Sequence, residues 1–126
     1  MNYFRQLGNK LQNLAFGKSA EADAARLLKK HGYAILETNY RCKGGEIDIV
    51  ASEGKVLVFC EVKARRNKNY GSALEGLTPQ KARKIKAAAE HYLMKNNVAG
   101  VDIRFDVVTM DGVEGAQKVE LIRNAF

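Results

Sequence analysis

Two β-strand patterns joined by a short turn, within GEIDIVASEGKVLVFCEVKARR at residues 45–66, constrain the fold most strongly. Apolar residues recur at the spacing of half-buried strands, and Ser52-Glu53-Gly54 between the two runs is typical of a tight turn. The segment therefore predicts a β-hairpin with strands over about 46–51 and 55–64. Charged residues nevertheless interrupt both strands, at Glu46, Asp48, Glu61 and Lys63.

Apolar residues at helical spacing predict two helices. The first is expected over about 19–30, with Ser19 as its N-cap. The second is expected over about 79–95, because Thr78 is a typical N-cap and Pro79 suits the first helical position.

The remaining strand patterns place these helices around a sheet. They extend over about 33–41, 101–110 and 118–122, which gives an α-β-β-β-α-β-β order. This order predicts an α/β fold, a single-domain sandwich around a mixed central sheet. We expect the domain to span residues 17–126, after an N-terminal segment at 1–16 with the apolar spacing of a short amphipathic helix.

The net charge of +7 is concentrated in one part of the chain. Residues 63–86 hold eight of the 21 Lys and Arg but only one of the 14 acids. A local excess of positive charge favours a polyanionic partner, with nucleic acid preferred over a membrane surface. A basic face that only keeps the protein in solution is the alternative interpretation.

Location and redox state follow from two further observations. No apolar stretch reaches the ~20 residues that span a bilayer, and the first residues lack the apolar core of a signal peptide. We therefore expect a cytoplasmic protein, with no membrane partner. In that compartment Cys42 and Cys60 are expected to be reduced thiols.

The charged residues of the hairpin are expected to meet. Side chains alternate along a strand, so Glu46 and Asp48 share a face, as do Glu61 and Lys63. Glu21 lies beside the apolar stripe of the first helix and is a fourth acid that can converge on the same place. On the opposite, core-facing side we expect Ile47, Ile49, Val58, Cys60 and Val62.

Clustered carboxylates favour a cation as their partner, because a buried and unpaired carboxylate is costly. Oxygen ligands suit Mg²⁺ or Mn²⁺, and a nearby lysine can orient water or stabilise developing charge. These parts describe metal-dependent phosphodiester hydrolysis. The structural alternatives are an exposed Glu61–Lys63 ion pair, Asp48 as a turn cap and Glu21 as an acid facing the helix dipole.

Several separated motifs resemble the bacterial YraN-like family across about residues 17–126. They are GEIDIVA, LVFCEVKAR, Tyr70-Gly71, TPQKARKIKAAAEHYL and RFDVV, in this order. That family is related to Holliday-junction resolvases within the PD-(D/E)xK, or restriction-endonuclease-like, superfamily. The resemblance implies a restriction-endonuclease-like fold and a metal-dependent endonuclease that cuts DNA, either structure-selectively or non-specifically.

The resemblance also implies a role for each matching residue. Asp48 and Glu61 would be ligands of Mg²⁺ or Mn²⁺, with the Val62 carbonyl as a third, and Lys63 would position or activate the water. Glu21 matches the acid that resolvase-like branches place on the first helix.

Two positions depart from the wider pattern. Ile47 stands where the superfamily has proline, and Ala20 where this family commonly has glycine. Glu46 is typical of the GEID form and is either an alternate ligand or a supporting acid.

Basic and polar residues around the second helix are expected to contact phosphates without reading sequence. They are Arg65, Arg66, Lys68, Tyr70, Gln80, Lys81, Arg83, Lys84 and Lys86. Resolvase relatives act as dimers, so the resemblance implies a homodimer, with the apolar residues Phe4, Leu7 and Leu11 as contributors. The alternatives to an enzyme are a non-catalytic nucleic-acid-binding module and a docking protein for a DNA-processing partner.

Overall fold

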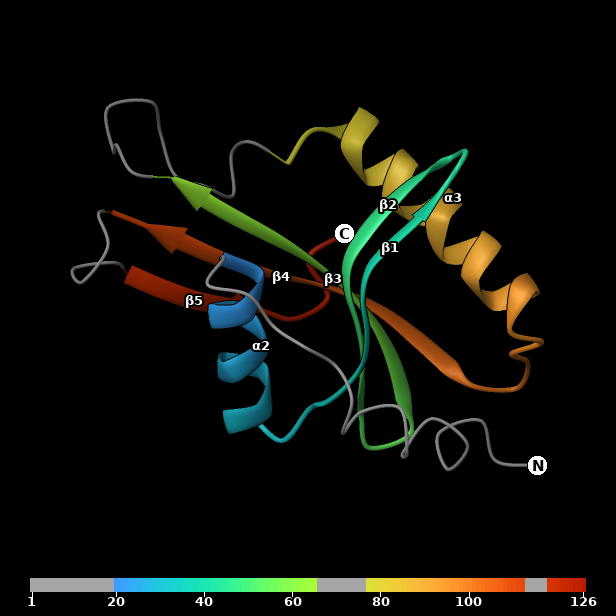
Figure 1. The fold of residues 1–126 in the computed structure, drawn as a ribbon, viewed down its shortest axis with the longest axis horizontal. Helices are drawn as coiled ribbons and strands as arrows, with labels where there is room; N and C mark the ends of the chain where they lie inside the picture. Colours follow the sequence, from blue (N-terminus) through green and yellow to red (C-terminus); the bar gives the residue numbers. More distant parts are fainter. Residues whose placement is uncertain (1–19, 66–76, 113–117) are drawn as a thin grey trace.

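The computed structural model describes residues 20–65, 77–112 and 118–126, which form an α/β sandwich with a five-stranded mixed sheet (Figure 1). The element order is α2 (Ala20–Lys30), β1 (Ala34–Cys42), β2 (Gly45–Glu53), β3 (Val56–Arg65), α3 (Pro79–Lys95), β4 (Asp102–Asp111) and β5 (Lys118–Ile122). This order confirms the α-β-β-β-α-β-β prediction. Predictions that concern the N-terminal segment, or Arg66, Lys68 and Tyr70, lie outside the described residues, as does the Arg65 side chain.

The strands lie in the sheet in chain order, β1-β2-β3-β4-β5. The neighbours β3 and β4 are parallel, and the other three pairs are antiparallel. A parallel pair needs a crossover connection, and α3 is the helix in the connection between these two strands. No helix in the described ranges is long and apolar enough to cross a membrane.

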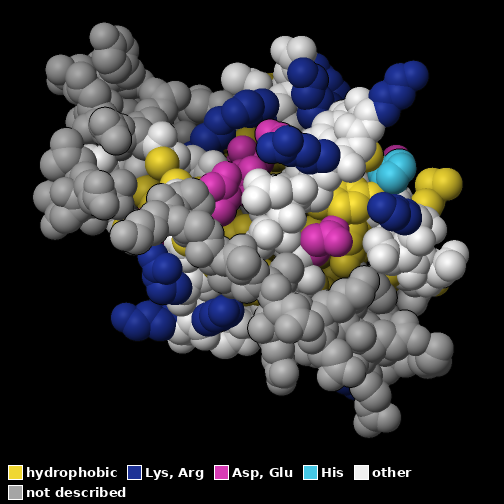
Figure 2. All heavy atoms as spheres, in the orientation of Figure 1, with side chains coloured by type: hydrophobic (Ala, Val, Ile, Leu, Met, Phe, Trp, Pro, Cys, Tyr) yellow, Lys and Arg dark blue, Asp and Glu magenta, His cyan; other side chains and the backbone are white. Residues whose placement is uncertain are grey.

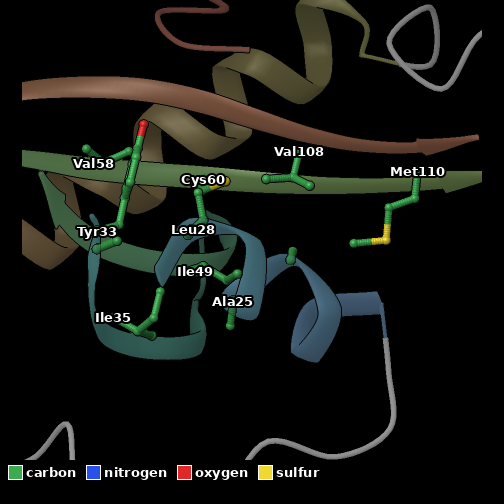
Figure 3. Close-up of a cluster of buried hydrophobic side chains, with 11 residues drawn as sticks. Ala25, Leu28, Tyr33, Ile35, Ile49, Val58, Cys60, Val108 and Met110 are labelled. Carbon is green, nitrogen blue, oxygen red and sulfur yellow. The ribbon is translucent and has the colours of Figure 1, made fainter. Parts of the chain in front are cut away.

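The two helices cover opposite faces of the sheet. Alternate residues of β3 divide between them, because Leu57 and Phe59 pack in the cluster beneath α3 whereas Val58 and Cys60 pack with α2. Figure 3 shows the α2 cluster, in which Leu28 lies against the sheet. Both cysteine thiols are free, as predicted, and Cys60 is fully buried in this cluster.

The N-terminus of α3 forms where the sequence predicts it. Thr78 is the N-cap, and its hydroxyl accepts a hydrogen bond from the N–H of Lys81 at 3.2 Å. Pro79 follows as the first helical residue, and the first turn contains no acid. The positive end of the helix is therefore not neutralised by its own residues.

The side-chain alternation of β1 and β2 breaks at one position. Ile47 packs beneath α3, whereas Ile49 packs with α2, so the prediction that they share a face is wrong. Asn39 adopts a left-handed backbone conformation with φ of 54° and lies opposite Asp48 in the register. The switch of faces in β2 itself falls at Asp48, between Ile47 and Ile49.

A buried polar network lies away from this break. Asp106 is fully buried and accepts hydrogen bonds from Tyr33 at 2.6 Å and from Arg104 at 2.8 Å. Burial alone would raise the pKa of Asp106, but these bonds and one from the Asn124 N–H hold it below its usual value. Arg104 continues the network to Glu53 at 2.7 Å. Asp106 is thus a structural residue within the sheet.

Candidate functional site

The pairing of β2 with β3 ends at Ile49 and Cys60, and Asp48 lies just beyond this point. Its carboxylate oxygen Oδ2 accepts a hydrogen bond from the backbone N–H of Val62 at 2.8 Å. A side chain therefore continues the link between the strands after the backbone ladder stops. This bond fixes the Asp48 carboxylate between β2 and β3 instead of leaving it on either face.

Glu61 and Asp48 form a pair of partly buried acids. Their carboxyl groups are within hydrogen-bonding reach of each other. Burial, followed by the charge of Asp48, raises the pKa of Glu61 to about 7. Burial also raises the pKa of Asp48, although its bond from Val62 opposes this. The two acids therefore resist simultaneous ionisation unless a cation joins them.

Two further acids approach this pair from different elements. Glu21, in the first turn of α2, is partly buried and close enough for its charge to raise the pKa of Asp48. Glu46 has a smaller effect of the same sign. Its side chain is exposed and lies 3.3 Å from Arg41 in an ion pair. The structure thus brings all four predicted acids to one region, with Asp48 and Glu61 at its centre.

Lysines from β3 and α3 meet beside the acids. Lys63 is partly buried, and this burial lowers its pKa, as does the neighbouring Lys81 ammonium group. The charges of Lys81 and Lys63 in turn lower the pKa of Glu61, against the effect of burial. The first turn of α3 therefore supplies a second cation at the site, next to the lysine of the E-x-K motif.

The other predicted phosphate contacts on α3 lie on different sides of the helix. Lys84 faces the same region as Lys81, and both line one cleft. Lys86 lies over the rings of Phe105 and Phe126, about 5.8 and 6.0 Å from their centres, and so points elsewhere. The remaining two residues are exposed but do not line the cleft: Gln80 and Arg83.

The cleft has a volume of about 460 Å³ and lies between α3 and the turn that joins β1 to β2. Glu46 and Glu61 line it together with basic residues from both sides. On the face shown in Figure 2, acidic side chains lie together next to Lys and Arg side chains. Sequence reasoning did not select two basic residues that line this cleft, Arg41 near the end of β1 and Lys43 in the β1–β2 turn.

The donor set fits a hard cation that keeps part of its water shell. No three acidic, histidine or cysteine side chains among the described residues are arranged to enclose a metal on their own. Mg²⁺ does not need such a cage, because it is bound by one or two carboxylates together with waters and substrate phosphates. Asp48 and Glu61 supply two carboxylates whose mutual repulsion a divalent cation would relieve.

The fold, together with the aspartate and E-x-K residues at the end of the β2–β3 pairing, defines a small α/β protein with a mixed five-stranded sheet and a candidate acidic site. The chain belongs to the uncharacterised protein family UPF0102, whose family model matches residues 20–110. This result confirms the family that the sequence motifs indicated.

Similar proteins span nearly the same length. A UPF0102 protein of Desulfosudis oleivorans is 49% identical over 115 residues, which cover 91% of this chain and 92% of that protein. One from Idiomarina loihiensis is 41% identical over 118 residues, 92% of this chain and 100% of that protein. One from Syntrophus aciditrophicus is 43% identical over 115 residues, 91% of each chain.

Proposed function

We propose that this protein is a metal-dependent endonuclease that hydrolyses DNA phosphodiester bonds in the cytoplasm, without reading base sequence. The observation that carries the proposal is the Asp48–Glu61 pair, two partly buried acids with raised pKa values beside two lysines. A structural ion pair does not explain it, because the acids repel each other and lie too deep for water to screen them fully.

Asp48 and Glu61, with the carbonyl oxygen of Val62, would hold Mg²⁺ or Mn²⁺. The metal would polarise the scissile phosphate and lower the pKa of a bound water. Because the Val62 N–H fixes the Asp48 carboxylate at 2.8 Å, one ligand is oriented before any metal binds. Such preorganisation avoids the free-energy cost of ordering the side chain during the reaction.

Lys63 and Lys81 would act on the phosphate and the attacking water. The Lys63 ammonium lies beside Glu61 and can hold the water or the negative charge that develops on the phosphate oxygens. Lys81 adds a charge from the start of α3, where the positive end of the helix dipole also favours an anion. Both lysines therefore favour the more negatively charged transition state.

The proposal is tested by cleavage of a labelled panel of single strand, duplex, flap, fork and four-way junction, each with Mg²⁺, Mn²⁺ or EDTA. We expect metal-dependent cutting that Lys63→Ala reduces at least about 100-fold, the effect of removing one preorganised electrostatic contact. Lys55→Ala is the matched control, because Lys55 is exposed at the turn between β2 and β3. Binding of DNA without cutting by the wild-type protein would favour a non-catalytic module instead.

Metal binding is expected to stabilise the protein more at pH 8 than at pH 6. Metal ligands must be deprotonated, and Glu61 has a pKa of about 7 without metal. The pKa of Glu61 is 4.5 in the unfolded chain and about 7 in the metal-free fold, so protonation of Glu61 stabilises that fold fully below pH 4.5. This stabilisation is lost as the pH rises through 7. Thermal unfolding with Mn²⁺ or EDTA at both pH values measures the difference. An equal metal-induced shift at both values would contradict it.

A further inference from the structure

The cleft beside the acids has basic residues on both of its walls. Arg41 comes from the end of β1 and Lys43 from the β1–β2 turn, whereas Lys81 and Lys84 come from α3. Arg41 forms an ion pair with Glu46. Lys43, Lys81 and Lys84 are exposed and line the same cleft. Charges on two facing walls favour an anionic chain that lies between them over one that lies across a flat surface.

The turn and the helix touch at residues that line the cleft. A Cβ atom at Gly45 would lie only 2.5 Å from the carbonyl oxygen of Lys84, so the two backbones are in direct contact there. Gly44 is next to it, where a Cβ atom would make an ordinary 3.5 Å contact with Ala87. Gly44, Gly45 and Lys84 all line the cleft, so this contact holds the turn close to α3 beside it.

The size and lining of the cleft define what it accepts. Its volume of about 460 Å³ is within the ~300–1,000 Å³ range of small-molecule pockets. That space accommodates one or two nucleotides but not a double helix. No aromatic side chain is among the described residues that line it, so the bases have no ring to stack on. Binding would depend on the phosphates, which are the same for every sequence.

We propose that the cleft holds an unpaired nucleotide segment of the DNA strand next to the scissile phosphate. This inference rests on the proposed nuclease function. It adds that the protein acts on unpaired DNA, which is either a single strand or a single-stranded region next to a duplex. Lys43 and Lys84 contact its phosphates from opposite walls. Glu61 lines the cleft and is also a member of the Asp48–Glu61 pair, so a strand bound in the cleft lies beside the reacting phosphate.

The test measures binding and does not depend on cutting. Fluorescence anisotropy in EDTA compares a labelled oligothymidylate with a duplex of equal length over a range of salt concentrations. We compare Lys43→Gln/Lys84→Gln with the control Lys30→Gln/Lys55→Gln, which removes the same charge at exposed positions outside the cleft. All four residues are exposed, so both double variants are expected to fold.

The wild-type protein should bind the single strand more tightly than the duplex. Loss of two phosphate contacts should weaken single-strand binding at least about fivefold and reduce the slope of log K against log salt by about 1.4, near 0.7 per contact. The control should change single-strand binding less than twofold. Equal losses in the two double variants, or a larger loss on duplex than on single strand, would overturn the inference.

The same data separate this inference from the proposed function. If DNA of every form stays uncut while the single-strand effect is present, the nuclease proposal fails and the cleft assignment stands. If DNA is cut in a metal-dependent way but Lys43→Gln/Lys84→Gln binds the single strand as the wild type does, the cleft assignment fails and the nuclease proposal stands.

Discussion

Glu61→Gln is expected to make the metal-free protein more stable at pH 8 and to abolish DNA cleavage. Glutamine has nearly the same shape but cannot ionise, so it removes the repulsion from Asp48 that raises the Glu61 pKa to about 7. Protonated Glu61 stabilises the fold at acid pH and loses this effect as the pH rises, whereas glutamine keeps it at every pH. After allowance for solvent screening, we expect a gain of about 1–2 kcal/mol at pH 8 and little change at pH 5.

The same substitution should remove the metal-linked increase in melting temperature and reduce the cleavage rate at least about 100-fold. Urea unfolding at the two pH values, with thermal unfolding in Mn²⁺, measures both effects. Glu90→Gln is the matched control, because Glu90 is an exposed acid on α3 for which neither change is expected. A variant that is less stable than wild type at pH 8 would show that Glu61 has a structural role instead, and the active-site assignment would be lost.

Gly45→Ala is expected to destabilise the protein by about 2–3 kcal/mol. The new Cβ atom would lie 2.5 Å from the Lys84 oxygen and 3.1 Å from the Lys84 carbonyl carbon. These are backbone atoms inside α3, so relief requires the turn or the helix to move as a whole. Either movement also changes the cleft, and we expect weaker single-strand binding in the fraction that folds.

Gly44→Ala provides the control for this prediction. Its Cβ atom would meet only the Cβ of Ala87, at the ordinary contact distance of 3.5 Å. We expect a change of less than about 1 kcal/mol for this variant, in line with substitutions that introduce no clash. Urea unfolding of the two variants beside wild type measures the difference. Similar midpoints for both would show that the turn adjusts without strain.

Most of the fold could be predicted because its signals are local. Thr78 and Pro79 define the start of α3, and the predicted hairpin joins β2 to β3. Its turn is Gly54-Lys55 and not Ser52-Glu53-Gly54, because Ser52 and Glu53 still pair with Leu57 and Val56. The switch of faces at Asp48 could not be predicted in this way. It falls where the β2–β3 backbone pairing has ended and the Asp48 carboxylate bonds to the Val62 N–H, and simple alternation therefore placed Ile47 and Ile49 on one face.

The site was predictable to a similar degree. Strand alternation was sufficient to bring Glu61 and Lys63 together, and the hairpin brought Asp48 to them. Arg41 and Lys43 were missed because their place in the cleft depends on packing between distant segments, through the contact of Gly45 with α3. The Gly44-Gly45 pair was the available signal, since adjacent glycines often mark a close approach of two backbones.

The arrangement of the site across the β2–β3 hairpin and α3 has a consequence for how the chain folds. Asp48 and Glu61 are near each other in sequence and need only a short loop to close, whereas Lys81 and Lys84 join them after a much longer segment has been ordered. The acid pair and Lys63 can therefore assemble before the α3 lysines join them. In a nascent or partly unfolded chain with its hairpin formed but α3 undocked, Lys81 and Lys84 would be missing from the cleft, so full affinity for a DNA strand reports that α3 is in place.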